Sequence, residues 1–205
     1  MSWFHNATES KVLIGLHGQK RVGKDTVCGF LLEWYEQLGY GVERRSFASS
    51  LKLSAARAIG LQFETAEEAE EWAELFKLHG EIRHGALGHT PSVVISGREY
   101  LQNYGTQAHR DIFGTDFWVD MCLPPHSSEL PDDTIVVVTD VRFPNEAQRI
   151  RDLGGEVWHI LRPELEQEGD THASEVPLPS DLVDYVIVND RSLEDLRDQA
   201  IGLVK

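Results

Sequence analysis

The sequence predicts an α/β fold in which helices cover a mainly parallel five-stranded sheet. Strand-like and helix-like patterns alternate along the chain, two strand patterns are almost wholly apolar, and a glycine-rich turn joins the first strand to a helix. Strands that alternate with helices form right-handed crossovers and therefore parallel sheets. The five predicted strands are residues 11–17, 41–48, 134–140, 156–162 and 184–190.

Two of these segments support the sheet most strongly. "KVLIGLH" (11–17) is nearly all apolar, as expected of a strand that is covered on both faces. "TIVVVTD" (134–140) is a β-branched run that ends at an aspartate, which is typical of a central strand. The pattern of residues 41–48 is weaker.

Helical patterns lie between the strands. Apolar residues recur at helical spacing after the glycine-rich turn, from Val27 to Leu38. A later helix starts with Pro144 near its first turn, and the last helix follows a Ser192 cap with Asp195 three residues on. Other helical segments are residues 51–60, 65–80 and 96–113.

We expect a single domain, since 205 residues suit one α/β domain with a substantial core. The core comprises residues 11–60 and 134–205. Residues from about 61 to 125 are too long for one crossover and form a helical insertion. Residues 163–183 are rich in proline and acidic side chains, and a long loop in a compact domain is often functional.

The composition excludes some classes of protein. The net charge of −15, from 19 basic and 34 acidic residues, argues against general nucleic-acid binding. Cys28 and Cys122 give neither a disulfide framework nor metal-type spacing, so each is predicted to be a small buried residue. The first ten residues do not resemble a signal peptide, and no apolar stretch approaches the roughly 20 residues of a membrane span. We expect a cytoplasmic protein without a membrane partner.

The segment "HGQKRVGKDT" (17–26) has the spacing of a phosphate-binding loop. Gly18, four residues, Gly23 and Lys24 lie between a strand and a helix, which is the context this motif requires. Glycines let backbone N–H groups approach phosphate oxygens, and the helix start adds positive potential. We expect Lys24 to reach the β- and γ-phosphates and Arg21, inside the loop, to contact the same nucleotide.

Asp25 is a departure from the usual motif, in which a hydroxyl follows the lysine. An acid in the first turn of a helix is favoured by the helix dipole. A carboxylate beside triphosphate would be repulsive without a metal, so we expect Asp25 to help hold Mg²⁺. Thr26 then offers the hydroxyl one position later.

Several motifs resemble those of a known family. "GKDT" is similar to the GK-x-T ending of nucleoside monophosphate kinases such as adenylate kinases, and "TDVRFPNEAQRI" is similar to a strand-end segment of adenylate kinases. Together and in order, the motifs resemble the bacteriophage deoxynucleoside monophosphate kinases, over residues 12 to about 197. The motifs are "GKDT", "SFASSLK" (46–52), "REYLQNYGTQAHRDIFGTDFWV" (98–119), "DVRFPNEA" (140–147) and "HASE" (172–175).

This resemblance implies a three-layer P-loop kinase fold, in which the insertion binds the monophosphate and residues 163–183 form a short lid-like loop. It implies transfer of the ATP γ-phosphoryl group to a deoxynucleoside 5′-monophosphate with Mg²⁺, in the host cytoplasm if the protein is phage-encoded. Such an acceptor is already an oxyanion, so the enzyme must align two polyanions rather than supply a base. Arginine forks serve this purpose best.

The ends of strands supply two candidates on this basis. Asp140 ends a strand at the edge of the sheet where ligands of α/β folds bind, and would hold magnesium waters. Arg142, two residues on, would grip the acceptor or the transferring phosphate. Arg45 and Lys52 are further candidates for binding the substrate phosphate.

The resemblance places the stretch from Arg98 over the monophosphate. Arg98 would bind phosphate and Gln102, four residues on and on the same helix face, would bind the base. Arg110 is a less central substrate candidate. We expect Lys24, Arg142, Arg98 and Arg162 to act on the transferring phosphoryl group, with Arg162 at the edge of the lid-like loop.

Other assignments are open. Asn189 follows the last strand, where adenine often lies in such folds, whereas His172 and Glu175 have no definite chemistry. Tyr100, Tyr104 and Trp118 could stack on a base, but aromatic residues at helical spacing more often form core. The base and the sugar are undetermined, and a homodimer is one option. Two alternative functions are a P-loop kinase of dephospho-coenzyme A or an isoprenoid phosphate, and a nucleotide-binding switch without an acceptor.

Overall fold

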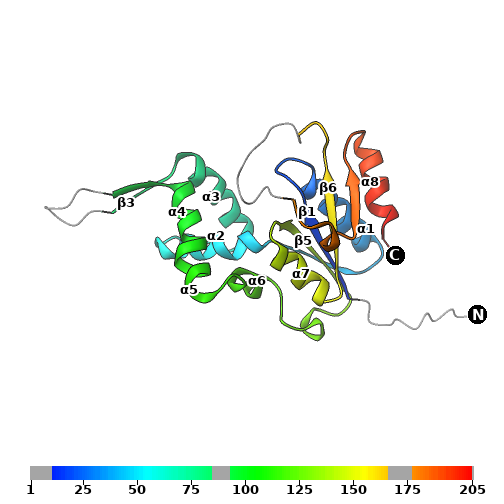
Figure 1. The fold of residues 1–205 in the computed structure, drawn as a ribbon, viewed down its shortest axis with the longest axis horizontal. Helices are drawn as coiled ribbons and strands as arrows, with labels where there is room; N and C mark the ends of the chain where they lie inside the picture. The colour runs from blue at the N-terminus through cyan, green and yellow to red at the C-terminus, as the bar shows by residue number, and fades with distance from the viewer. Residues whose placement is uncertain (1–10, 85–92, 166–176, 205) are drawn as a thin grey trace, which may run out of the picture. The chain divides into compact units, whose positions relative to one another are not determined.

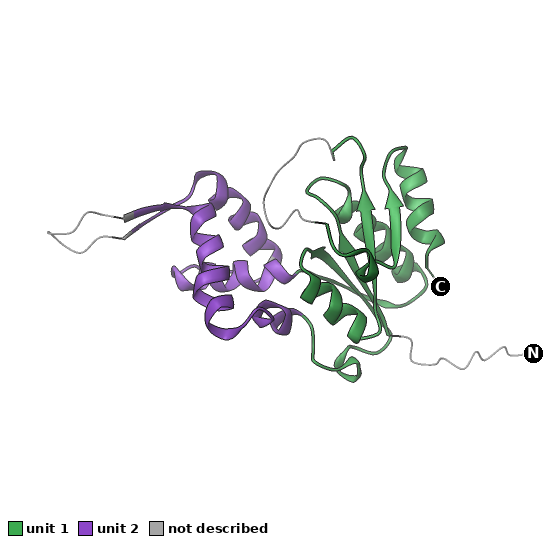
Figure 2. Cartoon of the chain, viewed as in Figure 1, with its two compact units in different colours: residues 1–46, 123–205 green, residues 47–122 purple. Residues whose placement is uncertain are grey.

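The computed structural model describes residues 11–84, 93–165 and 177–204. The chain divides into two compact units, shown in Figure 2. Unit 1 comprises residues 1–46 and 123–205, and unit 2 comprises residues 47–122. Residues 47–58, which the sequence pattern places with the core, form a helix that packs on other helices of unit 2.

Unit 1 contains the predicted five-stranded sheet, and every pair of neighbouring strands in it is parallel. The strand order is β2-β5-β1-β6-β7, which puts β1 in the centre. The strands are β1 (Val12–His17), β2 (Gly41–Arg45), β5 (Thr134–Val141), β6 (Glu156–Leu161) and β7 (Tyr185–Val188). The α/β fold with a parallel sheet is therefore confirmed.

Helices cover both faces of this sheet (Figure 1). Ile14 and Leu16 of β1 belong to a buried cluster with residues of helices α1 (Lys24–Gln37) and α8 (Leu193–Gly202). On the other face, a side chain at Gly15 would collide with Ile150 of helix α7 (Pro144–Asp152). The alternation along β1 thus builds three layers.

The predicted helix starts in unit 1 are confirmed. Pro144 is the first residue of α7, where its missing N–H costs no hydrogen bond. Ser192 caps α8, and its hydroxyl oxygen accepts the N–H of Asp195 at 3.1 Å while the Asp195 carboxylate accepts the N–H of Ser192 at 3.2 Å. Short 3₁₀ turns lie at Ser127–Glu129 and Ser180–Leu182.

The described residues of unit 2 form helices and one short hairpin. The antiparallel hairpin, β3 (Glu81–His84) with β4 (Val93–Ser96), was not predicted, because four-residue strands are too short to show a clear alternation. The expected helix over residues 96–113 is broken by a five-residue π-helix. The helical segments are α2 (Phe47–Ala58), α3 (Ala66–His79), α4 (Gly97–Gly105), the π-helix Thr106–Arg110, α5 (Asp111–Phe113) and α6 (Phe117–Cys122).

Aromatic side chains form much of the interior of unit 2. Trp118 is 1% exposed and donates its indole N–H to the carbonyl of Gly105 at 2.9 Å. The Tyr100 hydroxyl donates to the carbonyl of Ala55 at 2.7 Å, and the Tyr104 hydroxyl lies 2.8 Å from that of Ser54. The two tyrosine contacts join α4 to α2 and the Trp118 contact joins α6 to α4, which favours the core interpretation of the three aromatic residues over base stacking.

Two further predictions concern burial. Cys28 is buried as expected, and burial raises the pKa of its thiol to about 11, whereas Cys122 is only half-buried. Among the helices of residues 11–84, 93–165 and 177–204, none combines the length and apolar character needed to cross a membrane.

Candidate active site

The predicted phosphate loop joins β1 to α1 at the carboxyl end of the central strand. Gly18, Arg21 and Gly23 have φ values of 141°, 68° and 109°, so the backbone turns repeatedly through the left-handed region. A side chain at Gly18 would lie 2.4 Å from the carbonyl oxygen of Ile160 on β6. Such turns orient successive N–H groups into a concavity that binds anions.

The start of α1 adds to this anion site. Gly23 is the N-cap residue and has no side chain that could cover the first N–H groups of the helix. Lys24 begins the helix, and its ammonium donates to the carbonyls of Gly18 and Gln19 at 2.7 Å each. The Lys24 ammonium group therefore lies against the phosphate loop, where it is predicted to contact the nucleotide phosphates.

Asn189, the residue directly after β7, forms a hydrogen bond to the phosphate loop that the sequence did not predict. Its side-chain amide donates to the carbonyl of Val22 at 2.8 Å, and its backbone N–H donates to Leu161 at 2.7 Å. A side chain at Gly23 would collide with this amide. The adenine contact expected at Asn189 stays a prediction, beside a role in holding the loop.

Asp25 forms an ion pair with Arg44 of β2, with 2.9 Å between Oδ1 and Nη2. The side chain of Asp25 is 79% exposed and that of Arg44 is 42% exposed, so the pair is accessible to solvent. Arg44 was not among the predicted site residues, although it stands in a basic pair within a predicted strand, and β2 ends at that pair. Its guanidinium offsets part of the extra negative charge at the loop, and Thr26 next to Asp25 is exposed.

The end of β5 carries Asp140 and, just beyond it, Arg142. The Ser46 hydroxyl donates to Asp140 Oδ2 at 2.8 Å. Glu146, at 2% exposure, accepts the backbone N–H groups of Arg142 at 2.7 Å and Phe143 at 3.0 Å, while the Arg142 side chain is exposed. Glu146 was also missed, although an acid at the third position of a helix is a known capping signal.

Arg45 and Arg162 are both engaged locally within unit 1. Arg45 contacts both carboxylate oxygens of Glu43, through Nε at 2.8 Å and Nη2 at 2.9 Å. Arg162 lies 3.6 Å from Glu164 and is 42% exposed. The Arg162 pair is well exposed, and ion pairs of this kind are weak, so Arg162 can exchange its carboxylate for a phosphate at little cost. The Arg45 pair is bidentate and less exposed, so it is held more firmly.

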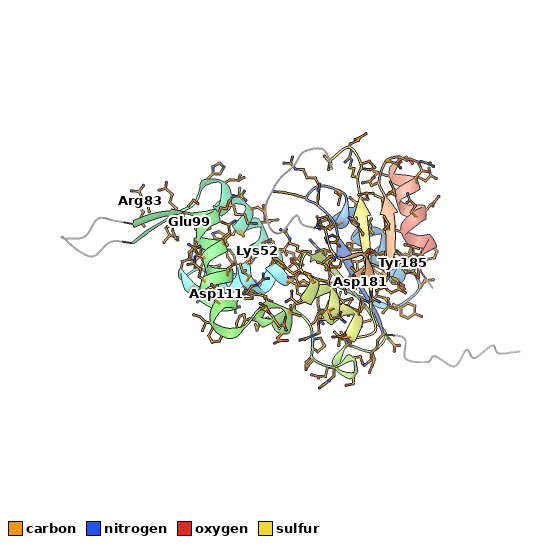
Figure 3. The ribbon with its side chains drawn as sticks, viewed as in Figure 1. Lys52, Arg83, Glu99, Asp111, Asp181 and Tyr185 are labelled. Atoms are coloured by element: carbon orange, nitrogen blue, oxygen red, sulfur yellow. The ribbon has the colours of Figure 1, made fainter. Side chains whose placement is uncertain are left out.

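The remaining predicted substrate residues lie in unit 2. Arg98 and Gln102 are both exposed on α4, and Arg110 is half-buried at the end of the π-helix. Lys52 on α2, labelled in Figure 3, is only 14% exposed and lies 3.8 Å from Glu74 of α3. His172 and Glu175 lie outside the described residues.

Comparison with known proteins identifies the family. The family described as deoxynucleotide monophosphate kinase matches residues 61–200. A putative deoxynucleotide monophosphate kinase of Acanthamoeba polyphaga mimivirus is 34% identical, over 94% of this chain and 96% of its own length. The chain belongs to the deoxynucleotide monophosphate kinase family.

Two other similarities are more distant. The deoxynucleoside-5′-monophosphate kinase of Escherichia phage T5 is 22% identical, over 87% of this chain and 89% of its own length. The solved structure of an APS kinase mutant from Mycobacterium tuberculosis aligns with a TM-score of 0.41 and 12% identity, over 95% of this chain and 96% of that one. A TM-score of 0.41 is too low to support an argument about the present protein.

Membership of this kinase family confirms the resemblance seen in the sequence. It does not favour the two alternatives, a kinase of dephospho-coenzyme A or isoprenoid phosphate and a non-catalytic switch. The family match includes Arg98, Asp140 and Arg142, whereas the phosphate loop precedes it and falls within the region similar to the mimiviral kinase. The roles of the single residues stay predictions.

The carboxylates of Asp25 and Asp140 are the groups predicted to hold a magnesium ion, and their chemistry suits a metal carried by a nucleotide. Within residues 11–84, 93–165 and 177–204, no group of three or more histidine, cysteine or acidic residues is placed to hold a metal. Mg²⁺ usually keeps several waters and binds one or two carboxylates plus substrate phosphates rather than an all-protein cage. Asp140 and Asp25 are carboxylates of the required kind.

Proposed function

We propose that this kinase transfers the γ-phosphoryl group of ATP to a deoxynucleoside 5′-monophosphate and releases ADP and the deoxynucleoside diphosphate. The observation that carries the proposal is the phosphate loop, with Lys24 held against it, in a member of this family. In this proposal unit 1 binds ATP and unit 2 contributes to binding the monophosphate.

The backbone N–H groups of the loop and of the first turn of α1 bind the donor phosphates, and Lys24 neutralises charge on them. Bound with ATP, Mg²⁺ supplies further neutralisation of the phosphate charge, and Asp140 and Asp25 would hold it, directly or through water. Arg142 and Arg162 stabilise the transferring group, since they stay charged and can bind phosphate in a bidentate way.

The acceptor needs orientation rather than activation. Its phosphate oxygens are already nucleophilic near neutral pH, so no side chain has to remove a proton. In this proposal Arg98 binds the monophosphate and Gln102 contacts the base, as the family resemblance implies. Both side chains are exposed on one face of α4, which supports this assignment. Arg45, Lys52 and Arg110 support substrate binding. The homodimer and the cytoplasmic location expected from the sequence stay predictions.

An ADP-release assay with ATP, Mg²⁺ and each deoxynucleoside monophosphate, and with the matching ribonucleotides, tests the proposal. We expect acceptor-dependent turnover with at least one deoxynucleotide. Lys24→Ala should lower kcat by at least about 100-fold, because charge stabilisation of the transferring group is lost. Arg83→Ala removes one positive charge from a 74% exposed side chain and serves as the control. Absence of acceptor-dependent turnover by the wild-type protein would refute the proposed function.

A further inference from the structure

His17 is the last residue of β1 and directly precedes Gly18 of the phosphate loop. It is only 6% exposed and has no part in the chemistry proposed above. Its Nδ1 lies 2.9 Å from the carbonyl oxygen of Val141 at the end of β5, and its Nε2 lies 3.4 Å from the backbone nitrogen of Leu178. Both ring nitrogens therefore meet backbone groups of unit 1.

These partners determine the tautomer of the ring. A carbonyl oxygen can only accept a hydrogen bond, so Nδ1 carries the proton and donates it to Val141. A backbone N–H can only donate, so Nε2 accepts from Leu178 through its lone pair. The ring is neutral, and a flip of the imidazole would lose both hydrogen bonds.

Proton transfer and metal binding are not roles for this ring. Burial, with smaller contributions from the neighbouring His159 and Lys24, lowers the pKa of His17 to about 4 although the hydrogen bond to Val141 opposes the shift, which makes the imidazole a weak base. The only unprotonated nitrogen, Nε2, is engaged by the Leu178 N–H. The remaining property of the ring is that it fixes the position of the backbone groups it contacts.

The contact to Val141 lies beside an irregularity of the sheet. Along β1 and β5, Gly15 pairs with Val138, but His17 pairs with Val141. One residue of β1 thus opposes two of β5, namely Thr139 and Asp140, which is the arrangement of a β-bulge. Bulges redirect side chains and occur next to active sites, and here the bulged pair includes the predicted magnesium ligand Asp140.

A bulge weakens the backbone ladder that would otherwise hold the strand end. The hydrogen bond from His17 to Val141 holds this strand end in place. Val141 lies between Asp140 and Arg142 in the chain, so the bond constrains the backbone next to both. We propose that His17 is a positioning residue for phosphoryl transfer, which fixes Asp140 and Arg142 relative to the first residue of the phosphate loop. The inference rests on the kinase function proposed above.

Three variants separate the two hydrogen bonds. In His17→Asn, the amide nitrogen is attached to Cγ as Nδ1 is, so it can donate to Val141 but cannot reach Leu178. In His17→Gln, the polar atoms stand one bond further out, where they replace Nε2 and the contact to Leu178. His17→Phe keeps a ring of similar size and loses both hydrogen bonds.

We expect the bond to Val141 to matter most for the reaction. His17→Gln and His17→Phe should lower kcat by about 10- to 100-fold, since small displacements of aligned groups have effects of this size. They should also raise the KM for the monophosphate and the Mg²⁺ concentration at half-maximal rate several-fold. In His17→Asn, kcat, the KM for the monophosphate and the Mg²⁺ concentration at half-maximal rate should all stay within about threefold of the wild-type values. A loss of folded protein alone would lower the rate without changing either concentration dependence.

Two results would overturn the inference. One is a wild-type kcat, KM and Mg²⁺ dependence in both His17→Gln and His17→Phe, and the other is a defect of His17→Asn as large as that of His17→Phe. Thermal unfolding of each variant reports its folded fraction, and if His17→Phe does not fold, the comparison of Asn with Gln decides. If the wild-type protein has no turnover, the proposed function fails, and Mg²⁺-dependent binding of a non-hydrolysable ATP analogue to the same variants then tests His17.

Discussion

Glu146 provides the sharpest test of how the strand end beside Arg142 is held. Its carboxylate accepts two backbone N–H groups, from Arg142 and Phe143, and the residue is 2% exposed. Glu146→Ala would leave both donors without this acceptor and would remove a negative charge from the first turn of α7. A hydrogen bond to a charged group contributes about 1.5 kcal/mol at the lower end of its range, so two of them give about 3 kcal/mol.

The loss of charge near the helix start adds about 0.5 kcal/mol. We therefore expect Glu146→Ala to lower the free energy of unfolding by about 3.5 kcal/mol, measured by urea denaturation. Glu146→Gln keeps a carbonyl oxygen in place of Oε2, which accepts both N–H groups, so its loss should be about 1 kcal/mol. At urea concentrations where both variants are folded, kcat of Glu146→Ala should fall about 10-fold or more. The reason is that the position of the Arg142 side chain depends on the backbone that Glu146 holds.

The comparison of the two variants can contradict this reasoning. If the free energy of unfolding of Glu146→Ala lies within about 1 kcal/mol of the wild-type value, the two N–H groups find other acceptors and the carboxylate does not hold the strand end. If Ala and Gln lose equal stability, the charge rather than the acceptor geometry is the stabilising feature. An unchanged kcat in folded Glu146→Ala would show that Arg142 does not depend on this anchor.

Three further predictions concern the phosphate loop. Asp25→Ser should raise the Mg²⁺ concentration at half-maximal rate several-fold and leave the KM for the monophosphate unchanged; if neither value changes, Asp25 is only a charge at a helix end. Asn189→Ala should raise the KM for ATP, and Asn189→Asp should raise it more, because a carboxylate would face the Val22 carbonyl. An equal KM in the wild type and both variants would show that the hydrogen bond from Asn189 to the loop is not needed. The folded-state pKa of His17 is lowered to about 4, below that of the unfolded chain, so protonation favours the unfolded state as pH falls from above 6.5 towards 4. Between pH 7 and pH 5 the wild type should therefore lose about 2 kcal/mol more stability in urea unfolding than His17→Asn, and parallel losses would contradict the neutral buried ring.

Local patterns in the sequence determined much of unit 1. The apolar run before Gly18, the β-branched run ending at Asp140 and the Ser192 cap each depend on neighbouring residues, and each is present as predicted. The phosphate loop is also local, since its glycine spacing and its place between a strand and a helix lie within ten residues. Alternation of strands and helices was sufficient to predict the parallel sheet.

Contacts between distant residues were decided only by the tertiary structure. Asp25 meets Arg44, Asn189 meets Val22 and His17 meets Val141 across separations of 19, 167 and 124 residues. No local pattern records such pairs, because they depend on the order β2-β5-β1-β6-β7 and on the bulge opposite Leu16. The sequence by itself thus determined which residue types the site contains, whereas the packing of parallel strands decided which of them hold one another in place.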